Sequence, residues 1–161
     1  MKIIAPSAVV DKIEHAMSDL RTRWSYYAEI LDAFDVVSKP DATATMTMMK
    51  DYIIVHPKFI VEMSDEQRVF VLATMAQFVM LDVASRRGHR DARVWNIAAL
   101  YVISSRLVER GVISPSNMPW GTLYDSSFAP HMEIEDVYDD VNFRLYRGEG
   151  LRLVTTGEPA Q

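Results

Sequence analysis

Residues 70–104 read FVLATMAQFVMLDVASRRGHRDARVWNIAALYVIS. The first half of this stretch is apolar on nearly every side, which predicts a central helix that is buried all round and continues to about Ser85. Gly88 then interrupts the pattern, and Asp91 is a suitable N-cap for a second helix over residues 92–110. The stretch therefore predicts two helices joined by a short polar turn that is rich in arginine.

The sequence before this stretch predicts a long helix, a hairpin and a capped helix start. Apolar residues recur every three or four positions over residues 7–34, which is one stripe of an amphipathic helix. Residues 43–55 are rich in threonine, isoleucine and valine, which is typical of a β-hairpin. Ser64 and Gln67 have the spacing of a capping box, so we expect the central helix to begin there.

The sequence after the stretch predicts an ordered loop and one more helix. Residues 112–131 contain three prolines, and apolar residues at helical spacing from Ile134 onward indicate the final helix. We therefore expect an α+β fold, mainly α-helical, with a small β-hairpin or sheet. A single domain is expected over residues 1–147, followed by a partly mobile C-terminal tail over residues 148–161.

The composition is that of an ordinary globular protein, with 49% apolar and 24% charged residues. The chain has no cysteine, which excludes disulfides and thiolate chemistry. The net charge of -5 does not indicate a general nucleic-acid binder, but residues 133–140 hold five carboxylates, so the rest is neutral and can carry a basic face. No apolar run approaches the roughly 20 residues of a membrane-spanning helix. The N-terminal segment is a poor signal peptide, so we expect a cytoplasmic protein with no membrane partner.

The same stretch resembles a zincin-like metallopeptidase domain family that is found beside von Willebrand A-type domains in bacteria and phages. The most specific segments are RRGHRD at residues 86–91 and WNIA at residues 95–98. Residues 51–67 and 118–141 support the resemblance, which covers about residues 24–145. It implies a zincin-like fold in which helices pack around a small sheet.

Zinc chemistry in this family needs two histidines one helical turn apart, with a glutamate beside the first to activate the bound water. The histidine positions correspond here to Thr74 and Phe78, the glutamate position to Met75, and a third histidine position to Val83. Thr74 could supply at most a weak oxygen ligand. The resemblance therefore implies a degenerate member that has lost its metal ligands, with no catalytic residues and no cofactor.

Other polar groups of the family pattern are also replaced. The acidic position of the second helix corresponds to Leu100, and its asparagine corresponds to Ser104. The remaining histidines form no pair one helical turn apart, so a hydrogen-bonded or surface role is favoured for each of them. These histidines are His15, His56, His89 and His131.

Arginine and aromatic residues are interleaved in three segments, a pattern typical of single-stranded nucleic-acid binding. Arginines neutralise phosphates, and aromatic rings stack on unpaired bases. We expect the acidic residues 133–140 to lie away from such a surface, because their carboxylates would repel DNA. The candidate DNA-binding residues are Arg86, Arg87, Arg90, Arg93, Arg21, Arg23, Arg144, Tyr146 and Arg147.

Each of these segments also has a structural interpretation. Trp24 and Tyr27 lie on the predicted apolar stripe, and Trp95 belongs to the family motif. Arg144 and Arg147 can pair with the acidic run. A degenerate zincin also keeps a sheet edge that suits an extended peptide, so a protein-interaction module is the alternative. A metallopeptidase with unusual ligands is the third interpretation.

The sequence thus favours a non-catalytic protein that binds single-stranded DNA in a phage-type replication or transcription role. The phage setting rests on the family resemblance alone. A protein partner such as a polymerase and a homo-oligomer are both compatible with this expectation. The preference for single strands rests on the aromatic residues and on the lack of a helix-turn-helix or zinc-finger pattern.

Overall fold

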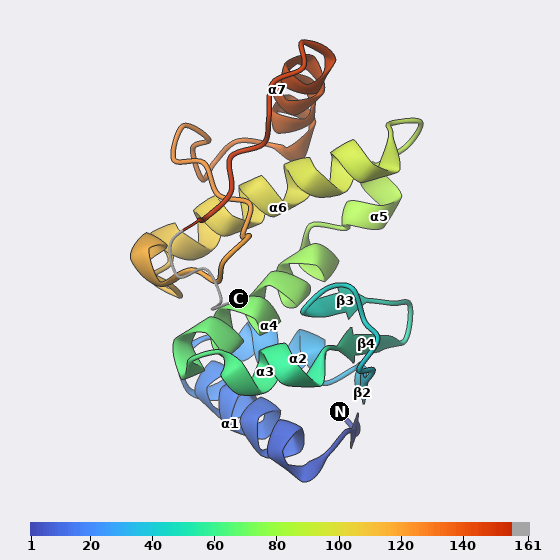
Figure 1. Cartoon of the computed structure of the whole chain (residues 1–161), viewed down its shortest axis with the longest axis vertical. Coiled ribbons are helices and arrows are strands. Elements are labelled where there is room, and N and C mark those ends of the chain that lie inside the picture. Colours follow the sequence, from blue (N-terminus) through green and yellow to red (C-terminus); the bar gives the residue numbers. More distant parts are fainter. Residues whose placement is uncertain (156–161) are drawn as a thin grey trace. The chain divides into compact units, whose positions relative to one another are not determined.

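The computed structural model describes residues 1–155. The chain forms two compact units, unit 1 over residues 1–77 and unit 2 from residue 78 onward. Within the described residues the fold is α+β, with seven α-helices and a four-stranded sheet, which confirms the predicted fold class (Figure 1). The predicted division into one domain over residues 1–147 and a mobile tail stays a prediction.

Unit 1 carries the sheet. In chain order its elements are β1 (Ile3–Ile4), α1 (Ser7–Arg23), α2 (Ser25–Leu31), β2 (Asp35–Ser38), β3 (Met46–Met48), β4 (Tyr52–Val55), α3 (Pro57–Glu62) and most of α4 (Asp65–Met80). The strand order is β1-β2-β4-β3. β2 is parallel to both β1 and β4, whereas β3 pairs antiparallel with β4. The predicted hairpin is therefore confirmed as β3 and β4.

The prediction of one long helix over residues 7–34 is wrong in one respect, because this segment forms two helices, α1 and α2. The backbone leaves helical geometry at Trp24, with φ -140° and ψ 64°. The apolar spacing continues through the break, since Leu20, Tyr27 and Leu31 are all fully buried. The spacing of apolar residues indicates which side of a helix faces the core, but it does not indicate whether the helical backbone is continuous. The strands β1 and β2 were not predicted, because two to four residues carry too little alternation.

The start of α4 follows the predicted capping box. The Ser64 amide donates to Oε1 of Gln67 at 3.0 Å, and the Gln67 amide donates to Oγ of Ser64 at 3.2 Å. Arg68, in the first turn, is buried and donates to the backbone oxygens of Ile60 and Met63. These bonds tie the start of α4 to α3 within unit 1.

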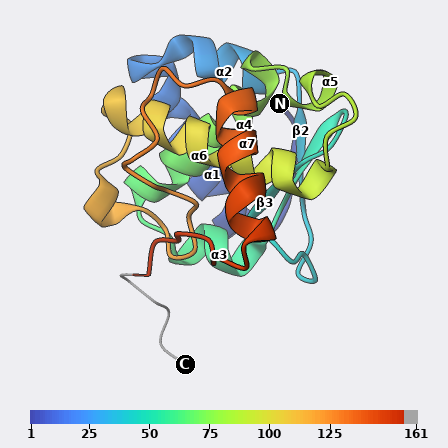
Figure 2. The same ribbon diagram turned by 90° about the horizontal axis from the view of Figure 1, so that it is seen from above.

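Unit 2 is built on two helices that cross. Its elements are the end of α4, α5 (Val83–Arg86), α6 (Ala92–Glu109), a 3-10 turn (Pro115–Asn117) and α7 (Ile134–Tyr146). α7 packs across α6, as both views show (Figures 1 and 2). The core between them contains Trp95, Ala98, Val102, Ile134, Val137 and Val141.

Two polar residues set the helix boundaries in unit 2. Asp82 adopts the left-handed conformation, with φ 50°, so α4 ends before it and the predicted continuation to Ser85 is wrong. Aspartate is one of the few residues that tolerates this conformation, because its short side chain can bond locally. Here it accepts a hydrogen bond from the Ser85 hydroxyl at 2.6 Å. Asp91 caps α6 as predicted, accepting from the Val94 amide at 3.0 Å.

The first part of the predicted tail is held in the structure. The Val154 amide donates to the Thr122 oxygen at 2.9 Å, and the Gly121 amide donates to the Val154 oxygen at 2.8 Å. Mobility of the tail stays a prediction, and residues 156–161 lie outside the described part. Among residues 1–155, none of the helices has the length and apolar character required to cross a bilayer.

Candidate functional site

The positions that correspond to the family's first histidine and its glutamate lie in α4 and belong to unit 1. Thr74 is 7% exposed, and its hydroxyl donates to the Phe70 oxygen at 2.9 Å. Met75 is also 7% exposed. The Thr74 hydroxyl hydrogen is therefore used by the backbone one turn earlier, and Met75 is an apolar packing residue.

The two further ligand positions belong to unit 2. Val83 is 2% exposed and is part of the core around Trp95. Phe78 packs against the same core but is only partly buried. Phe78 therefore packs as a hydrophobic residue at the border of this core, without being fully enclosed by it.

The side chains at these positions do not fit a zinc ion. Zinc in proteins takes thiolate, imidazole or carboxylate ligands, and these positions offer a hydroxyl, a thioether, a phenyl ring and an isopropyl group. In the part of the chain that the structure describes, no three histidine, aspartate or glutamate side chains group in a way that could hold a metal ion. The second helix offers no substitute, because Leu100 is apolar and Ser104 is buried.

Arg86, a member of the predicted DNA-binding cluster, is bound to carboxylates. Its guanidinium donates to Oε2 of Glu135 at 2.7 Å and to Oε2 of Glu133 at 3.2 Å. A further bond joins it to the Leu81 oxygen at 3.2 Å. The expectation that the acidic run lies away from this cluster is therefore wrong. Glu133 and Glu135 sit at the start of α7 and neutralise Arg86 directly.

This ion pair also shifts the titration of both partners. The hydrogen bond that Arg86 donates to Glu135 is the main reason that the pKa of Arg86 lies above its ordinary value. Burial alone would raise the pKa of Glu135, but the bonds from Arg86 outweigh burial and lower the pKa. Arg86 therefore joins α5 to α7 within unit 2, and its charge is already used there.

The other arginines of this cluster differ in their exposure and in their contacts. Arg90 is partly buried, with its guanidinium carbon 5.1 Å from the ring centre of Trp95 and 5.8 Å from that of Tyr138. Arg87 and Arg93 are exposed, and neither has an ion pair within residues 1–155. Two of the four arginines that are predicted to contact phosphate, Arg87 and Arg93, are thus exposed and free of ion pairs within the described residues.

The third segment is dominated by a buried carboxylate that the sequence analysis did not single out. The side chain of Asp125 is 1% exposed and pairs with Arg144 at 3.2 Å and with Arg152 at 3.3 Å. The hydroxyl and amide of Ser127 donate to it at 2.7 and 2.9 Å. The Tyr101 hydroxyl donates to the Arg152 oxygen at 2.9 Å. Arg144 is therefore a structural residue that links α7 to the loop.

The last two residues of that segment lie at the end of α7. Tyr146 is 89% exposed. Arg147 is exposed, with its Nε 3.6 Å from Oε1 of Glu149 and its guanidinium carbon 5.4 Å from the ring centre of Phe143. Phe143 itself is 57% exposed.

The first segment lies in unit 1. Arg21 forms a two-pronged ion pair with Asp32, with both N···O distances at 2.6 Å. The hydrogen bond from Arg21 is the main reason that the pKa of Asp32 lies below its ordinary value. Arg23 lies over the Trp24 ring, 4.2 Å from its centre. Arg21 thus closes the turn after α2.

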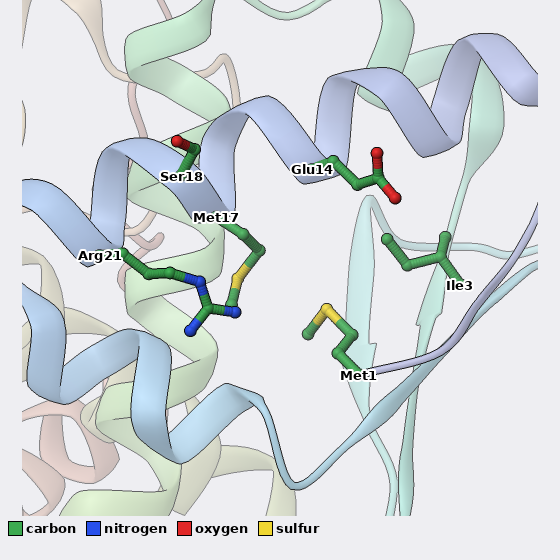
Figure 3. A pocket seen from close by; sticks show the side chains of 6 residues that line it. All are labelled: Met1, Ile3, Glu14, Met17, Ser18 and Arg21. Atoms are coloured by element: carbon green, nitrogen blue, oxygen red, sulfur yellow. The ribbon is translucent and has the colours of Figure 1, made fainter.

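Unit 1 also contains a pocket of about 300 Å³ beside α1 (Figure 3). Glu14, Met17 and Arg21 line it from α1, and Met1 lies at the opposite wall. Arg21 is the one candidate DNA-binding residue in its lining, and Asp32 holds its guanidinium. Its polar lining is the Glu14 carboxylate, the Ser18 hydroxyl and the paired guanidinium of Arg21, with no histidine beside the hydroxyl to act as a base.

Replacing Asp125 by asparagine is expected to lower stability at neutral pH by about 1–3 kcal/mol, because Arg144 and Arg152 lose a charged acceptor. Burial opposes ionisation of Asp125, but the bonds from Ser127 and Arg144 outweigh it and lower its pKa. The pKa of an aspartate in the unfolded chain is about 3.9, and the carboxylate of Asp125 stabilises the fold fully above that pH. This stabilisation is lost as the pH falls through the lower pKa that Asp125 has in the folded chain.

The measurement is the free energy of unfolding of the parent and the Asp125→Asn variant between acidic and neutral pH. The difference between them should be constant near neutrality and shrink in acid. Asp136→Asn is the matched control, because Asp136 is exposed and makes no ion pair within the described chain. A difference that does not change with pH would contradict this role for Asp125.

The chain can now be compared with known proteins. The family model described as "Putative metallopeptidase domain" matches residues 9–158 of the 161. The chain therefore belongs to this family. The comparisons with curated proteins and with solved structures gave no match.

Proposed function

We propose that this chain is a non-catalytic member of its metallopeptidase family that acts by binding another macromolecule. The observation that carries the proposal is that α4 uses for packing the positions at which the zincin resemblance implies catalytic groups. Met75 is buried at the position of the family's glutamate, and the Thr74 hydroxyl is bonded to the backbone. Neither of these side chains can act as a general base, and neither offers the carboxylate, imidazole or thiolate group that zinc prefers.

Single-stranded DNA is the ligand that we propose first. Support comes from the turn between α5 and α6 and from the first turn of α6, where Arg87 and Arg93 respectively are exposed and form no ion pair within the described chain. Arg90 lies between them, with its guanidinium next to two aromatic rings. Exposed guanidinium groups bind phosphates and can also stack on bases. A phage-type replication or transcription role in the cytoplasm is the setting that we propose.

Replacing Arg87 and Arg93 together by alanine is expected to weaken binding to single-stranded DNA and to make it less dependent on salt. Each lost phosphate contact lowers the magnitude of the negative slope of log affinity against log salt by about 0.7, so the double variant should lose about 1.4 of that magnitude. Arg86→Ala is a poor test, because it also breaks the ion pairs with Glu133 and Glu135.

The matched control removes the same two positive charges elsewhere. Lys39 and Lys50 are exposed residues of unit 1, and the Lys39→Ala/Lys50→Ala variant should bind DNA as the parent does. The readout is a DNA titration at several salt concentrations, with folding checked by circular dichroism. An unchanged slope in the arginine variant, or no binding by the parent at low salt, would overturn the DNA proposal.

An extended peptide is the second candidate ligand, because β3 lies at the edge of the sheet. The Met49 amide donates to the Tyr52 oxygen at 2.9 Å. Bonding alternates along an antiparallel ladder, so Met46 and Met48 direct their N–H and C=O groups away from β4. Such an edge can take up another strand. Peptide binding that Met48→Pro abolishes in a folded variant, without DNA binding, would favour this candidate.

A further inference from the structure

The outward face of α7 carries two large side chains that remain mostly exposed, although Arg147 lies over the ring of one of them, Phe143, with its guanidinium carbon 5.4 Å from the ring centre. The inward face contains Ile134, Val137 and Val141, which are fully buried against α6. On the outward face, Phe143 is 57% exposed and Tyr146 is 89% exposed. Exposed aromatic side chains next to one another on a helix commonly mark an interaction surface.

Charges of opposite sign flank Phe143 on this face. Asp139, Phe143 and Arg147 are spaced by four residues, so they lie along one side of the helix. Asp139 and the nearby Asp136 are exposed and form no ion pair within residues 1–155. Arg147 keeps helical backbone geometry, with φ -79° and ψ 0°. Its contact with Glu149, at 3.6 Å, uses one edge of the guanidinium.

This order of residues is complementary to itself. Asp139 and Arg147 are equally far from Phe143, about 6 Å along the axis on either side. When two such helices run antiparallel about a two-fold axis at Phe143, the two phenyl rings meet. Asp139 of each copy then faces Arg147 of the other. A parallel pair would instead place like charges together, so the face selects the antiparallel arrangement.

We propose that two copies of the chain pair through antiparallel α7 helices, with Phe143 at the centre and Asp139 facing Arg147 at both ends. The same face suits DNA poorly, because the carboxylates of Asp136 and Asp139 would repel phosphates. An interface built on one helix of thirteen residues is smaller than that of a permanent dimer. The dimer is therefore weak and forms reversibly as the concentration rises. This proposal does not depend on the ligand of the turn between α5 and α6.

Charge reversal provides the test, with sedimentation equilibrium of the full chain over a range of concentrations as the readout. Asp139→Arg alone, or Arg147→Asp alone, should weaken the dimer by about tenfold or more, because each places two like-charged pairs in contact. The double variant Asp139→Arg/Arg147→Asp should restore the parent dimer. Restoration cannot come from a general effect on folding, so it isolates the contact.

The matched control is Asp41→Arg, which makes the same charge change in an exposed loop of unit 1 and should leave the dimer unchanged. Phe143→Ala should weaken the dimer without unfolding the chain, because the ring is largely exposed. A parent that is monomeric at every concentration would overturn the proposal. A dimer that tolerates the single reversals, or that the double variant does not restore, would equally overturn it.

Discussion

Replacing Met75 by glutamate, the residue that the zincin resemblance implies at this position, is expected to lower the free energy of unfolding by about 3 kcal/mol at neutral pH. Met75 is 7% exposed, so the substitution would remove a packed side chain and bury a carboxylate that has no partner. Met75 serves packing at this position, so a carboxylate there would be destabilising.

The effect should depend on pH in a defined direction. Burial raises the pKa of the new carboxyl in the folded state above its unfolded value of about 4.3. The loss of stability is therefore greatest above the folded pKa and shrinks as pH falls toward the unfolded value. The comparison is made with the parent at each pH, because Asp125 makes the parent itself sensitive to acid.

Met75→Leu is the control for this experiment. It keeps the side chain apolar and close in volume, so it should cost less than about 1.5 kcal/mol. Denaturant unfolding of the three proteins supplies all the values. A glutamate variant as stable as the parent at neutral pH would show that position 75 reaches solvent, and the packing account of α4 would then be wrong.

The second large effect is expected at Trp95, where Trp95→Ala should destabilise unit 2 by about 3–5 kcal/mol. The indole is fully buried in the core between α6 and α7, and its Nε1 donates to the Val83 oxygen at 2.6 Å. The substitution removes the largest side chain of this core and leaves a buried carbonyl without its donor.

Two further variants separate packing from DNA stacking. Trp95→Phe keeps an aromatic ring but loses the hydrogen bond, so it should cost about 1–3 kcal/mol and leave DNA affinity unchanged. Trp120→Ala should have a much smaller effect on unfolding, because Trp120 is 49% exposed. If Trp95→Phe were as stable as the parent but bound DNA less tightly, Trp95 would be a stacking residue and its structural role would be refuted.

Much of the fold could be predicted because its signals are local. The capping box at Ser64, the cap at Asp91 and the hairpin over residues 43–55 each depend on residues that are close in sequence. The breaks at Trp24 and Asp82 could not be predicted in this way. The apolar spacing runs through the first, and aspartate at the second is an ordinary helix-surface residue until its backbone geometry is known.

The candidate site was harder to predict, because its decisive contacts join distant residues. Arg86 pairs with Glu135, which lies 49 positions later in the chain. Asp125 pairs with Arg152, which lies 27 positions later. The interleaving of arginine with aromatic residues indicated a cationic surface, but it could not show which charges are neutralised. The loss of the metal ligands, in contrast, is implied by the family resemblance position by position, and it stays a prediction.

The most direct test of the central claim is the zinc content of the full chain, purified from zinc-supplemented medium, together with its melting temperature before and after chelation. We predict far less than one zinc per chain and an unchanged melting temperature, because Thr74, Met75, Phe78 and Val83 offer no ligand set for zinc. One tightly bound zinc per chain, with a melting temperature that falls on chelation, would contradict the proposal that this family member is non-catalytic.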